Sequence, residues 1–394
     1  MPEKSVTSKP QFKLGYRPAL DGLRGVSIIA VMFVHGGLFW MGQGGFLGVD
    51  IFFVLSGFLI TSLLLEEWTQ NGSVSFRNFY IRRGLRLLPP LLLLIAICLI
   101  QVSLFPPPEG TAQSAKAVLV ALCYLSNWMP HAVYPPLFHT WSLGIEEQFY
   151  IVWPVLLVLL LWLRMRHRWI VLLLFLAIAA IGIHRAMLWH DLIGPDRTLV
   201  YTRLDARADA LLVGCIIGIV ISRNLIPSKR FLVGLIRSLA VVSVIGLSIC
   251  LVVVPSTSPF LYYGGFTLVA AMVATIIMNL FTSPWRLLVM VLELPWLRWF
   301  GRLSYGLYLW HLPVYVLYDR VAPRFPIRSY TLSIFVPFII KFTLSVGVAA
   351  LSFYFLEQPA LKLKSRFSAL RSRKEMDTFA AAPLIAAGEQ VSIR

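Results

Sequence analysis

Long apolar runs constrain this chain more than any other feature. Stretches such as LPPLLLLIAICLIQVSLF and VWPVLLVLLLWL recur along 394 residues, of which 58% are hydrophobic and only 13% are charged. A soluble protein carries about a quarter charged residues, whereas about 20 consecutive apolar residues suffice to cross a bilayer as a helix. We therefore predict an all-α fold, a polytopic transmembrane helical bundle.

The distribution of basic residues predicts how many spans there are. Candidate spans lie at 23–40, 46–66, 85–105, 115–129, 141–163, 169–188, 208–222, 231–254, 260–281, 303–320 and 332–356. The Arg-rich loop at 77–86 and the RMRHR loop at 164–168 both favour the cytoplasm, so an even number of crossings separates them. The weakest candidate between them, 115–129, is short and ends in polar residues, so we expect a re-entrant or interfacial segment there. About ten spans remain, with both termini in the cytoplasm.

The sequence predicts one membrane domain between two cytoplasmic tails. Residues 1–22 are polar and lack the apolar core and cleavage site of a signal peptide. The transmembrane domain is expected over 23–358, and a basic tail over 359–394. Membrane topology explains the net charge of +17, so no nucleic-acid partner is expected. The four cysteines lie inside apolar runs without CxxC spacing, so we expect no metal site.

Ionisable residues inside apolar spans are costly, and each is therefore a candidate functional group. The segment DGLRGVSIIAVMFVH places Arg24 at the cytoplasmic mouth of a helix. His35 lies about 16 Å further along the same helix, in its outer half. Asp50 opens the next span, where it either supports the imidazole or caps its own helix. Glu146 enters the fourth span at its outer end, and an aromatic belt does not explain it.

Further polar residues are expected to gather on the outer side, where a substrate could enter. Arg207 and Asp209 lie in RLDARADALLVG and either pair with each other or face that substrate. The other candidates on this side are His139, Tyr305 and His311.

Arginines also mark the cytoplasmic side. In FYIRRGLRLLPP, Arg82 and Arg86 lie one helical turn apart, which suits phosphate oxygens. The preference of basic residues for the cytoplasm predicts arginines here as well, so both interpretations stay open.

In their order and spacing, these motifs resemble the acyltransferase 3 family of integral-membrane O-acyltransferases, over roughly residues 15–360. The motifs are LDGLRGVSIIAVMFVH, GFLGVDIFFVLSGFLI, FYIRRGLRLLPP, HTWSLGIEEQFY, RADALLVG, GRLSYGLYLWHLP and LSFYFLEQP. The first contains an Arg-x10-His pattern, and the third contains Arg-x-x-Arg at Arg83 and Arg86.

The resemblance implies transfer of an acyl group, often acetyl, from cytoplasmic acyl-CoA to a hydroxyl of a glycan, glycolipid or similar acceptor. It implies a multi-pass location, most simply the bacterial cytoplasmic membrane. Many members carry a fused SGNH-hydrolase-like domain, which this chain lacks, so it would deliver the acyl group itself or pass it to a separate extracytoplasmic partner. The register of one motif stays open, because Arg203 and Asp205 have the same spacing as Arg207 and Asp209.

The residues and the resemblance together predict a division of roles. Arg24, Arg83 and Arg86 would hold the phosphates of acyl-CoA, which is a donor substrate and not a tightly bound cofactor. His35 would act as a general base or as a transient acyl carrier, oriented by Asp50 or Glu146. A transporter or flippase is the alternative, because it also needs ionisable residues inside the membrane.

Overall fold

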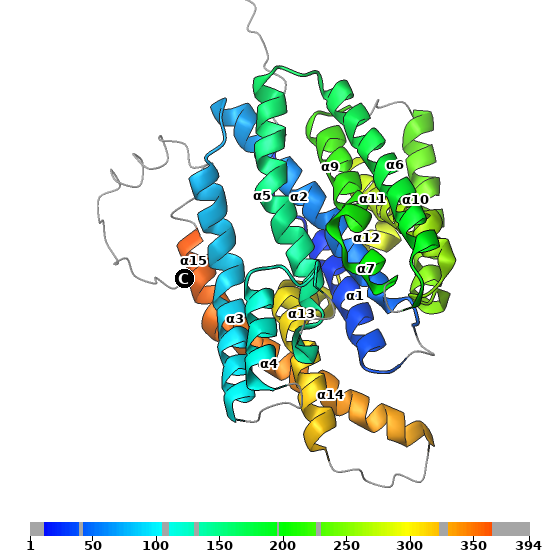
Figure 1. Ribbon diagram of the computed structural model, residues 1–394. Coiled ribbons are helices and arrows are strands. Elements are labelled where there is room, and N and C mark those ends of the chain that lie inside the picture. The colour runs from blue at the N-terminus through cyan, green and yellow to red at the C-terminus, as the bar shows by residue number, and fades with distance from the viewer. Residues whose placement is uncertain are drawn as a thin grey trace, which may run out of the picture.

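The computed structural model describes residues 12–38, 42–104, 110–129, 134–194, 197–225, 230–322 and 330–364. Every regular element in these ranges is helical (Figure 1). In chain order they are α1 (Pro18–His35), η2 (Gly45–Leu47), α2 (Gly48–Asn71), α3 (Phe76–Leu104), α4 (Thr111–Leu122), η4 (Pro135–Leu137), α5 (Thr140–Trp162), α6 (His167–Asp191), α7 (Arg197–Thr202), α8 (Leu204–Arg207), α9 (Asp209–Ser222), α10 (Arg230–Val253), η6 (Leu261–Gly265), α11 (Phe266–Thr282), α12 (Arg286–Leu292), α13 (Pro295–Val321), α14 (Tyr330–Ser352), η7 (Phe353–Glu357) and α15 (Gln358–Lys364).

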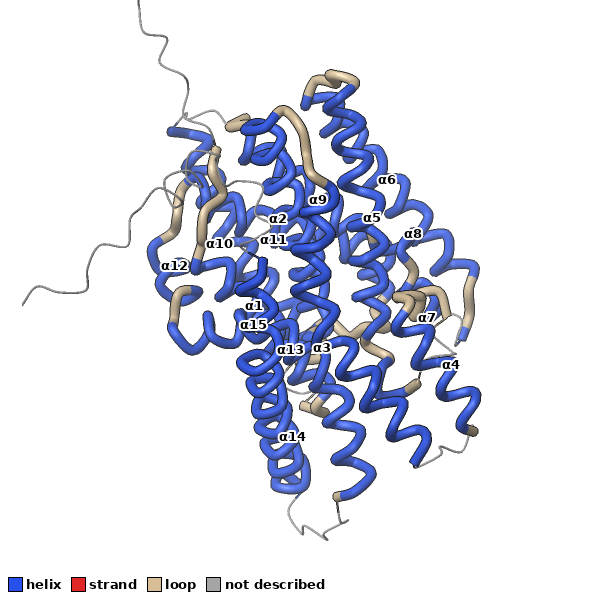
Figure 2. The backbone as a smooth tube through the Cα atoms, turned by 90° about the vertical axis from the view of Figure 1, so that its left-hand side faces the viewer, coloured by secondary structure: helices blue, strands red, loops and turns tan. Residues whose placement is uncertain are grey.

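The helical content and the apolar helix lengths confirm the predicted polytopic bundle. In the described part of the chain, 8 helices are long and apolar enough to cross a membrane. α9 is apolar but has only 14 residues, and α13 has 27 residues but is more polar. Most of the long helices run up and down the molecule and are joined at its two ends (Figures 1 and 2). The total of ten crossings stays a prediction.

The segment predicted not to cross the membrane contains the short helix α4. This helix has 12 residues and packs against the lower part of α3 (Figure 1). Twelve residues span about 18 Å at 1.5 Å per residue, less than the roughly 30 Å of hydrocarbon in a bilayer. α4 is therefore too short to cross by itself.

Both predicted domain boundaries differ from the helix ends. α1 begins at Pro18, inside the segment predicted as a tail, because proline suits the first position of a helix. At the other end, helix continues through α15 to Lys364, beyond the predicted boundary at 358. The rest of the two predicted tails, 1–11 and 365–394, lies outside the described residues.

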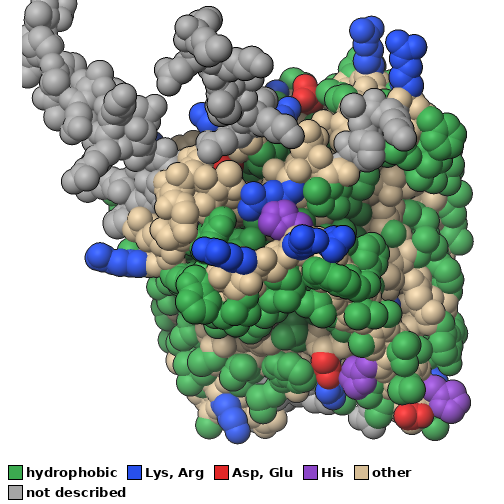
Figure 3. Space-filling model, turned by 90° about the horizontal axis from the view of Figure 1, so that it is seen from above, with side chains coloured by type: hydrophobic (Ala, Val, Ile, Leu, Met, Phe, Trp, Pro, Cys, Tyr) green, Lys and Arg blue, Asp and Glu red, His purple; other side chains and the backbone are tan. Residues whose placement is uncertain are grey.

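Helix α2 forms the centre of the bundle, whereas α6 and α10 lie at its periphery. The most apolar 18-residue stretch of α2 is 78% buried, whereas the corresponding stretches of α6 and α10 are each 22% buried. α2 crosses α9 closely because glycines face the partner backbone. A Cβ on Gly57 would lie 2.0 Å from the Leu211 carbonyl oxygen, and one on Gly214 would lie 2.2 Å from that of Val54. Many large hydrophobic side chains of the peripheral helices α5, α6 and α10 are exposed, as expected for a protein solvated by lipid. On the face seen from above, hydrophobic side chains lie among lysines and arginines (Figure 3).

Candidate active site

Three histidines from three different parts of the chain lie together, two of them buried and one, His35, exposed to a cavity. His35 ends α1, His311 lies in the middle of α13, and His139 immediately precedes α5. The ring centroids of His35 and His311 are 5.1 Å apart, and those of His139 and His311 are 5.2 Å apart. His139 and His311 are buried. The structure thus brings together the candidate catalytic histidine and two residues that the sequence assigned to the acceptor side.

The hydrogen bonds of His311 determine which nitrogen of His35 carries a proton. His311 Nδ1 lies 2.8 Å from the Tyr308 carbonyl oxygen and 3.0 Å from that of Leu307. Carbonyl oxygens only accept, so Nδ1 is the protonated nitrogen and, in a neutral ring, Nε2 holds a lone pair. That Nε2 lies 3.2 Å from His35 Nδ1, which must then donate. In neutral His35 the free lone pair is consequently on Nε2, as a general base requires.

His139 is buried, and its ring nitrogens make no hydrogen bond of good geometry with the described residues, although the Leu309 backbone lies near the ring. Its backbone carbonyl accepts a hydrogen bond of 3.0 Å from the Tyr308 hydroxyl, which is also 2.5 Å from the Ser142 hydroxyl. Buried polar groups are nearly always paired, so the His139 ring could make a hydrogen bond with a bound molecule.

A cavity of about 270 Å³ lies on one side of this cluster, among α1, α2, α3, α5 and α13. We call it the inner cavity. Its polar lining residues are Arg24, Ser56, Arg83, Arg86, Ser142, Glu146, Tyr150, Ser304, Tyr305 and Tyr308. The three arginines that the sequence assigned to donor binding therefore share one cavity, although they come from two helices far apart in the chain.

The charges of the inner cavity are only partly matched. Arg83 pairs with Glu147 at 3.2 Å. Arg24 and Arg86 line the cavity and form no direct ion pair or hydrogen bond with another described side chain, although Glu146 lies near Arg24 and Glu357 near Arg86. Glu146, the only carboxylate in the lining, accepts hydrogen bonds of 3.1 Å from Ser56 and Tyr150. The cavity thus presents three guanidinium groups against one carboxylate, an arrangement suited to an anion.

Two site predictions need correction here. Glu146 lies with the arginines and makes no hydrogen bond to His35, because α5 points its first turns into the inner cavity. Tyr305, predicted on the acceptor side, also lines the inner cavity and donates a hydrogen bond of 2.7 Å to the Leu87 carbonyl. The loop before α5 places His139 beside His311, outside the lining of the cavity that contains the arginines.

A second cavity, of about 950 Å³, lies on the other side of the histidine cluster, and His35 lines it. We call it the outer cavity. Its remaining lining residues are Val34, Gln43, Phe46, Phe138, Trp189, Gly194, Arg197, Tyr201, Pro255, Ser256, Thr257 and Tyr262. Tyr308 and Ser142, which line the inner cavity, both donate hydrogen bonds to the His139 backbone carbonyl, so these two side chains connect the inner cavity to the histidine cluster.

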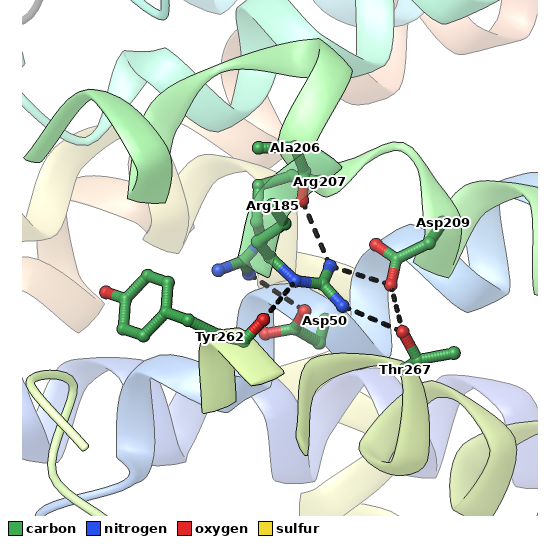
Figure 4. A network of polar contacts seen from close by, with 7 residues as sticks. All are labelled: Asp50, Arg185, Ala206, Arg207, Asp209, Tyr262 and Thr267. Atoms are coloured by element: carbon green, nitrogen blue, oxygen red, sulfur yellow. Dashed lines mark hydrogen bonds and ion pairs between the residues drawn. The ribbon is translucent and has the colours of Figure 1, made fainter. Parts of the chain in front are cut away.

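Asp50, Arg207 and Asp209 form a buried ion-pair network in place of the predicted contacts (Figure 4). Asp50 pairs with Arg207 at 2.8 Å, and Asp209 pairs with Arg185 at 2.8 Å. The predicted pairing of Arg207 with Asp209 is wrong, as is the predicted contact of Asp50 with His35. The reason is geometric: Arg207 and Asp209 flank the turn from α8 into α9 and face different helices, α2 and α6.

The same network ties five helices together. Arg185 also donates hydrogen bonds to the Tyr262 carbonyl at 3.3 Å, the Ala206 carbonyl at 3.0 Å and the Thr267 hydroxyl at 2.8 Å (Figure 4). Arg207 lies with its guanidinium 3.6 Å from the ring centroid of Phe266. Removing one partner of such a buried pair is far more costly than replacing both, so the network holds α2, α6, α8, α9 and α11 in place.

The alternative pair, Arg203 and Asp205, occupies a more exposed position. Arg203 Nε donates to Asp205 at 2.9 Å, and His184 lies 3.2 Å from the same carboxylate. Partial burial alone would raise the pKa of Asp205, but the hydrogen bonds from Arg203 outweigh it and lower that pKa. This pair therefore joins α8 to α6 locally, whereas Arg207 reaches the centre of the bundle.

Comparison with known proteins identifies the family. Residues 17–354 match the description "Acyltransferase domain", which is most of the chain. The chain belongs to the acyltransferase 3 family. It is 35% identical over 369 residues to the peptidoglycan O-acetyltransferase OatA of Listeria monocytogenes, covering 88% of this chain and 56% of that protein.

Other relatives of this acyltransferase 3 protein bear similar names. The putative peptidoglycan O-acetyltransferase YrhL of Bacillus subtilis is 34% identical over 87% of this chain and 55% of its own length. The O-acetyltransferase OatA of Staphylococcus aureus is 32% identical over 88% of this chain and 57% of its own. The chain thus spans about half the length of these relatives. No solved structure matches it.

Within this acyltransferase fold, sequence reasoning missed several residues of the site. Arg185 lies inside an apolar span, and its charge alone could have singled it out. Glu147 and Ser142 lie within the HTWSLGIEEQFY motif but were not assigned a contact. Trp189 and Arg197 gave no signal in the sequence, since they belong to no motif and become neighbours only through folding.

Proposed function

We propose that this protein is a membrane O-acetyltransferase that moves an acetyl or similar acyl group from acyl-CoA to a hydroxyl of a glycan, glycolipid or related acceptor. One observation carries the proposal: a cluster of three histidines lies between two cavities, with His35 lining the outer one, and three arginines line the inner one. The names of the relatives, which are O-acetyltransferases, support the same reaction class. The proposed location is the bacterial cytoplasmic membrane.

The inner cavity is the proposed donor site. Its volume of about 270 Å³ is near the lower limit of small-ligand sites, about 300–1,000 Å³, so it suits the thioester end of acyl-CoA better than the whole molecule. Arg24 and Arg86 would hold phosphate oxygens, because a guanidinium forms strong bidentate hydrogen bonds with them. The thioester would then reach Tyr308 and Ser142, beside the histidines.

The outer cavity is the proposed acceptor site, and His35 Nε2 is the proposed general base. Nε2 takes the proton of the acceptor hydroxyl while its oxygen attacks the thioester carbonyl carbon. The C–S bond then breaks, and the departing CoA sulfur takes the proton back from His35, which leaves an ester and free CoA. The single N–H of neutral His139 would donate to the oxyanion that forms in this step.

In this mechanism His311 is a positioning residue, since it acts through His35. It takes the place that a carboxylate has in a Ser-His-Asp triad: it accepts the hydrogen bond from Nδ1 and so leaves Nε2 free. In the alternative mechanism, His35 itself carries the acyl group before transfer to the acceptor. An acyl-enzyme trapped in the absence of acceptor would distinguish this mechanism from general-base catalysis.

The test of the proposed function is transfer from radiolabelled acetyl-CoA by purified protein in proteoliposomes. The proposal expects release of free CoA and labelled acceptor, both lost in His35→Gln. Movement of a polar or lipid-linked substrate across the bilayer without any consumption of acetyl-CoA would instead favour a transporter or flippase.

A further inference from the structure

The outer cavity carries an unbalanced positive charge. Among its lining residues Arg197 is the only one with a permanent charge, and no carboxylate lines the cavity. The other polar groups in the lining are neutral: Gln43, Tyr201, Ser256, Thr257 and Tyr262, together with His35. A cation that faces a cavity at the edge of an apolar bundle is costly to keep without a partner.

Arg197 is held in place by one aromatic ring against its guanidinium group and by a hydrogen bond from its Nε. Nε donates a hydrogen bond of 2.9 Å to the Leu192 carbonyl. The guanidinium carbon lies 4.3 Å from the ring centroid of Trp189. Trp189 is in turn stacked on Tyr262, with ring centroids 3.6 Å apart and an interplanar angle of 8°.

This arrangement leaves the two terminal nitrogens of Arg197 unused. Neither makes a hydrogen bond with another residue in the described parts of the chain. A guanidinium fixed by stacking and by its Nε keeps its fork of N–H groups ready for a planar or tetrahedral anion. Less conformational entropy is then lost when an anion binds.

We infer that the outer cavity binds an acceptor that carries a carboxylate or phosphate group, recognised by Arg197, in addition to the hydroxyl that is acylated at His35. The volume of about 950 Å³ has room for a sugar with such a group. This inference rests on the proposed function and specifies its substrate class: an anionic sugar is preferred over a neutral one.

Two sugars that differ by one carboxylate test this inference. N-acetylmuramic acid carries a lactyl carboxylate that N-acetylglucosamine lacks. With labelled acetyl-CoA, the wild-type protein should favour the acidic sugar in kcat/KM by about 10- to 100-fold, the range of a lost charge-assisted hydrogen bond. In Arg197→Gln the ratio should fall to about one, and in Arg197→Lys it should be intermediate.

The ratio is the readout because a folding defect lowers transfer to both sugars together. Arg237→Gln, which removes an exposed arginine from α10, is the matched control and should keep the wild-type ratio. A ratio near one in the wild type, or one unchanged in Arg197→Gln, would overturn the inference. So would Arg197-dependent binding of phosphatidylglycerol vesicles without any preference between the sugars, which would identify a lipid headgroup as the anion.

Failure of the proposed function gives a different result. If acetyl-CoA is hydrolysed in a His35-dependent manner but neither sugar is acetylated, only the acceptor inference is overturned. If acetyl-CoA is not consumed in any His35-dependent reaction, the proposed function is overturned together with the inference that rests on it.

Discussion

The hydrogen bond between His35 and His311 leads to a graded prediction. In His311→Phe the ring volume is nearly kept, but the acceptor of the bond from His35 Nδ1 is lost. At 3.2 Å between two neutral rings, this bond contributes about 0.5–1.5 kcal/mol. At 1.36 kcal/mol per factor of ten, kcat should fall by about 2- to 13-fold, with KM for acetyl-CoA little changed.

The matched variants are His311→Gln and His311→Asn. The contact to His35 uses Nε2, and the amide oxygen of Gln reaches a similar position, so Gln should restore much of kcat. The shorter Asn side chain cannot reach it and should behave as Phe does. These rates are measured as transfer of labelled acetyl from acetyl-CoA, after melting temperatures confirm that all three variants fold.

A solely structural role for His311 predicts a different order. Activity would then follow the melting temperatures of the variants, and Gln would have no advantage over Phe. That result, or wild-type kcat in all three variants, would refute the argument that His311 sets the tautomer of His35.

Three further predictions concern the donor site and the bundle. Arg24→Ala or Arg86→Ala should raise KM for acetyl-CoA by about 10- to 150-fold with kcat little affected; an unchanged KM would mean that these arginines do not bind the donor. Asp50→Ala leaves its buried arginine partner unpaired and should lower the free energy of unfolding by about 3–5 kcal/mol, seen as a lower melting temperature in detergent. Gly57→Ala should destabilise the protein by about 1–3 kcal/mol or more, whereas Gly182→Ala, with open space around its Cβ, should not.

The sequence was sufficient to predict the spans because hydropathy depends on composition along one helix. The apolar runs predicted the helices that the structure contains, and the polar end of 115–129 correctly marked a segment that does not continue as a spanning helix. The observed helix ends differ from the predicted span boundaries, as at Pro18, because capping and loop packing determine where a helix begins and ends.

Contacts between helices could not be predicted in the same way. Asp50 and Arg207 are 157 positions apart, and they meet only because Gly57 lets α2 approach α9 closely. The sequence showed that each residue places a charge inside the bundle, but it did not show which oppositely charged residue would pair with it. His35 and His311, 276 positions apart, are a second example.

Depth in the membrane was the other source of error. Glu146 was assigned to the outer side from its place near the start of a span. However, α5 begins inside the bundle, next to the loop that contains His139, so its second turn already faces the inner cavity. A residue count along one helix does not show where that helix starts.

Acyl transfer by His35→Ala protein in proteoliposomes tests the central claim most directly. His35 lines the acceptor cavity but not the donor cavity, so the variant should bind acetyl-CoA with the wild-type Kd. Transfer of labelled acetyl should be at least about 100-fold slower, the usual minimum for loss of a general base. Transfer at a rate close to that of the wild type would contradict the assignment of His35 and the two-cavity mechanism built on it.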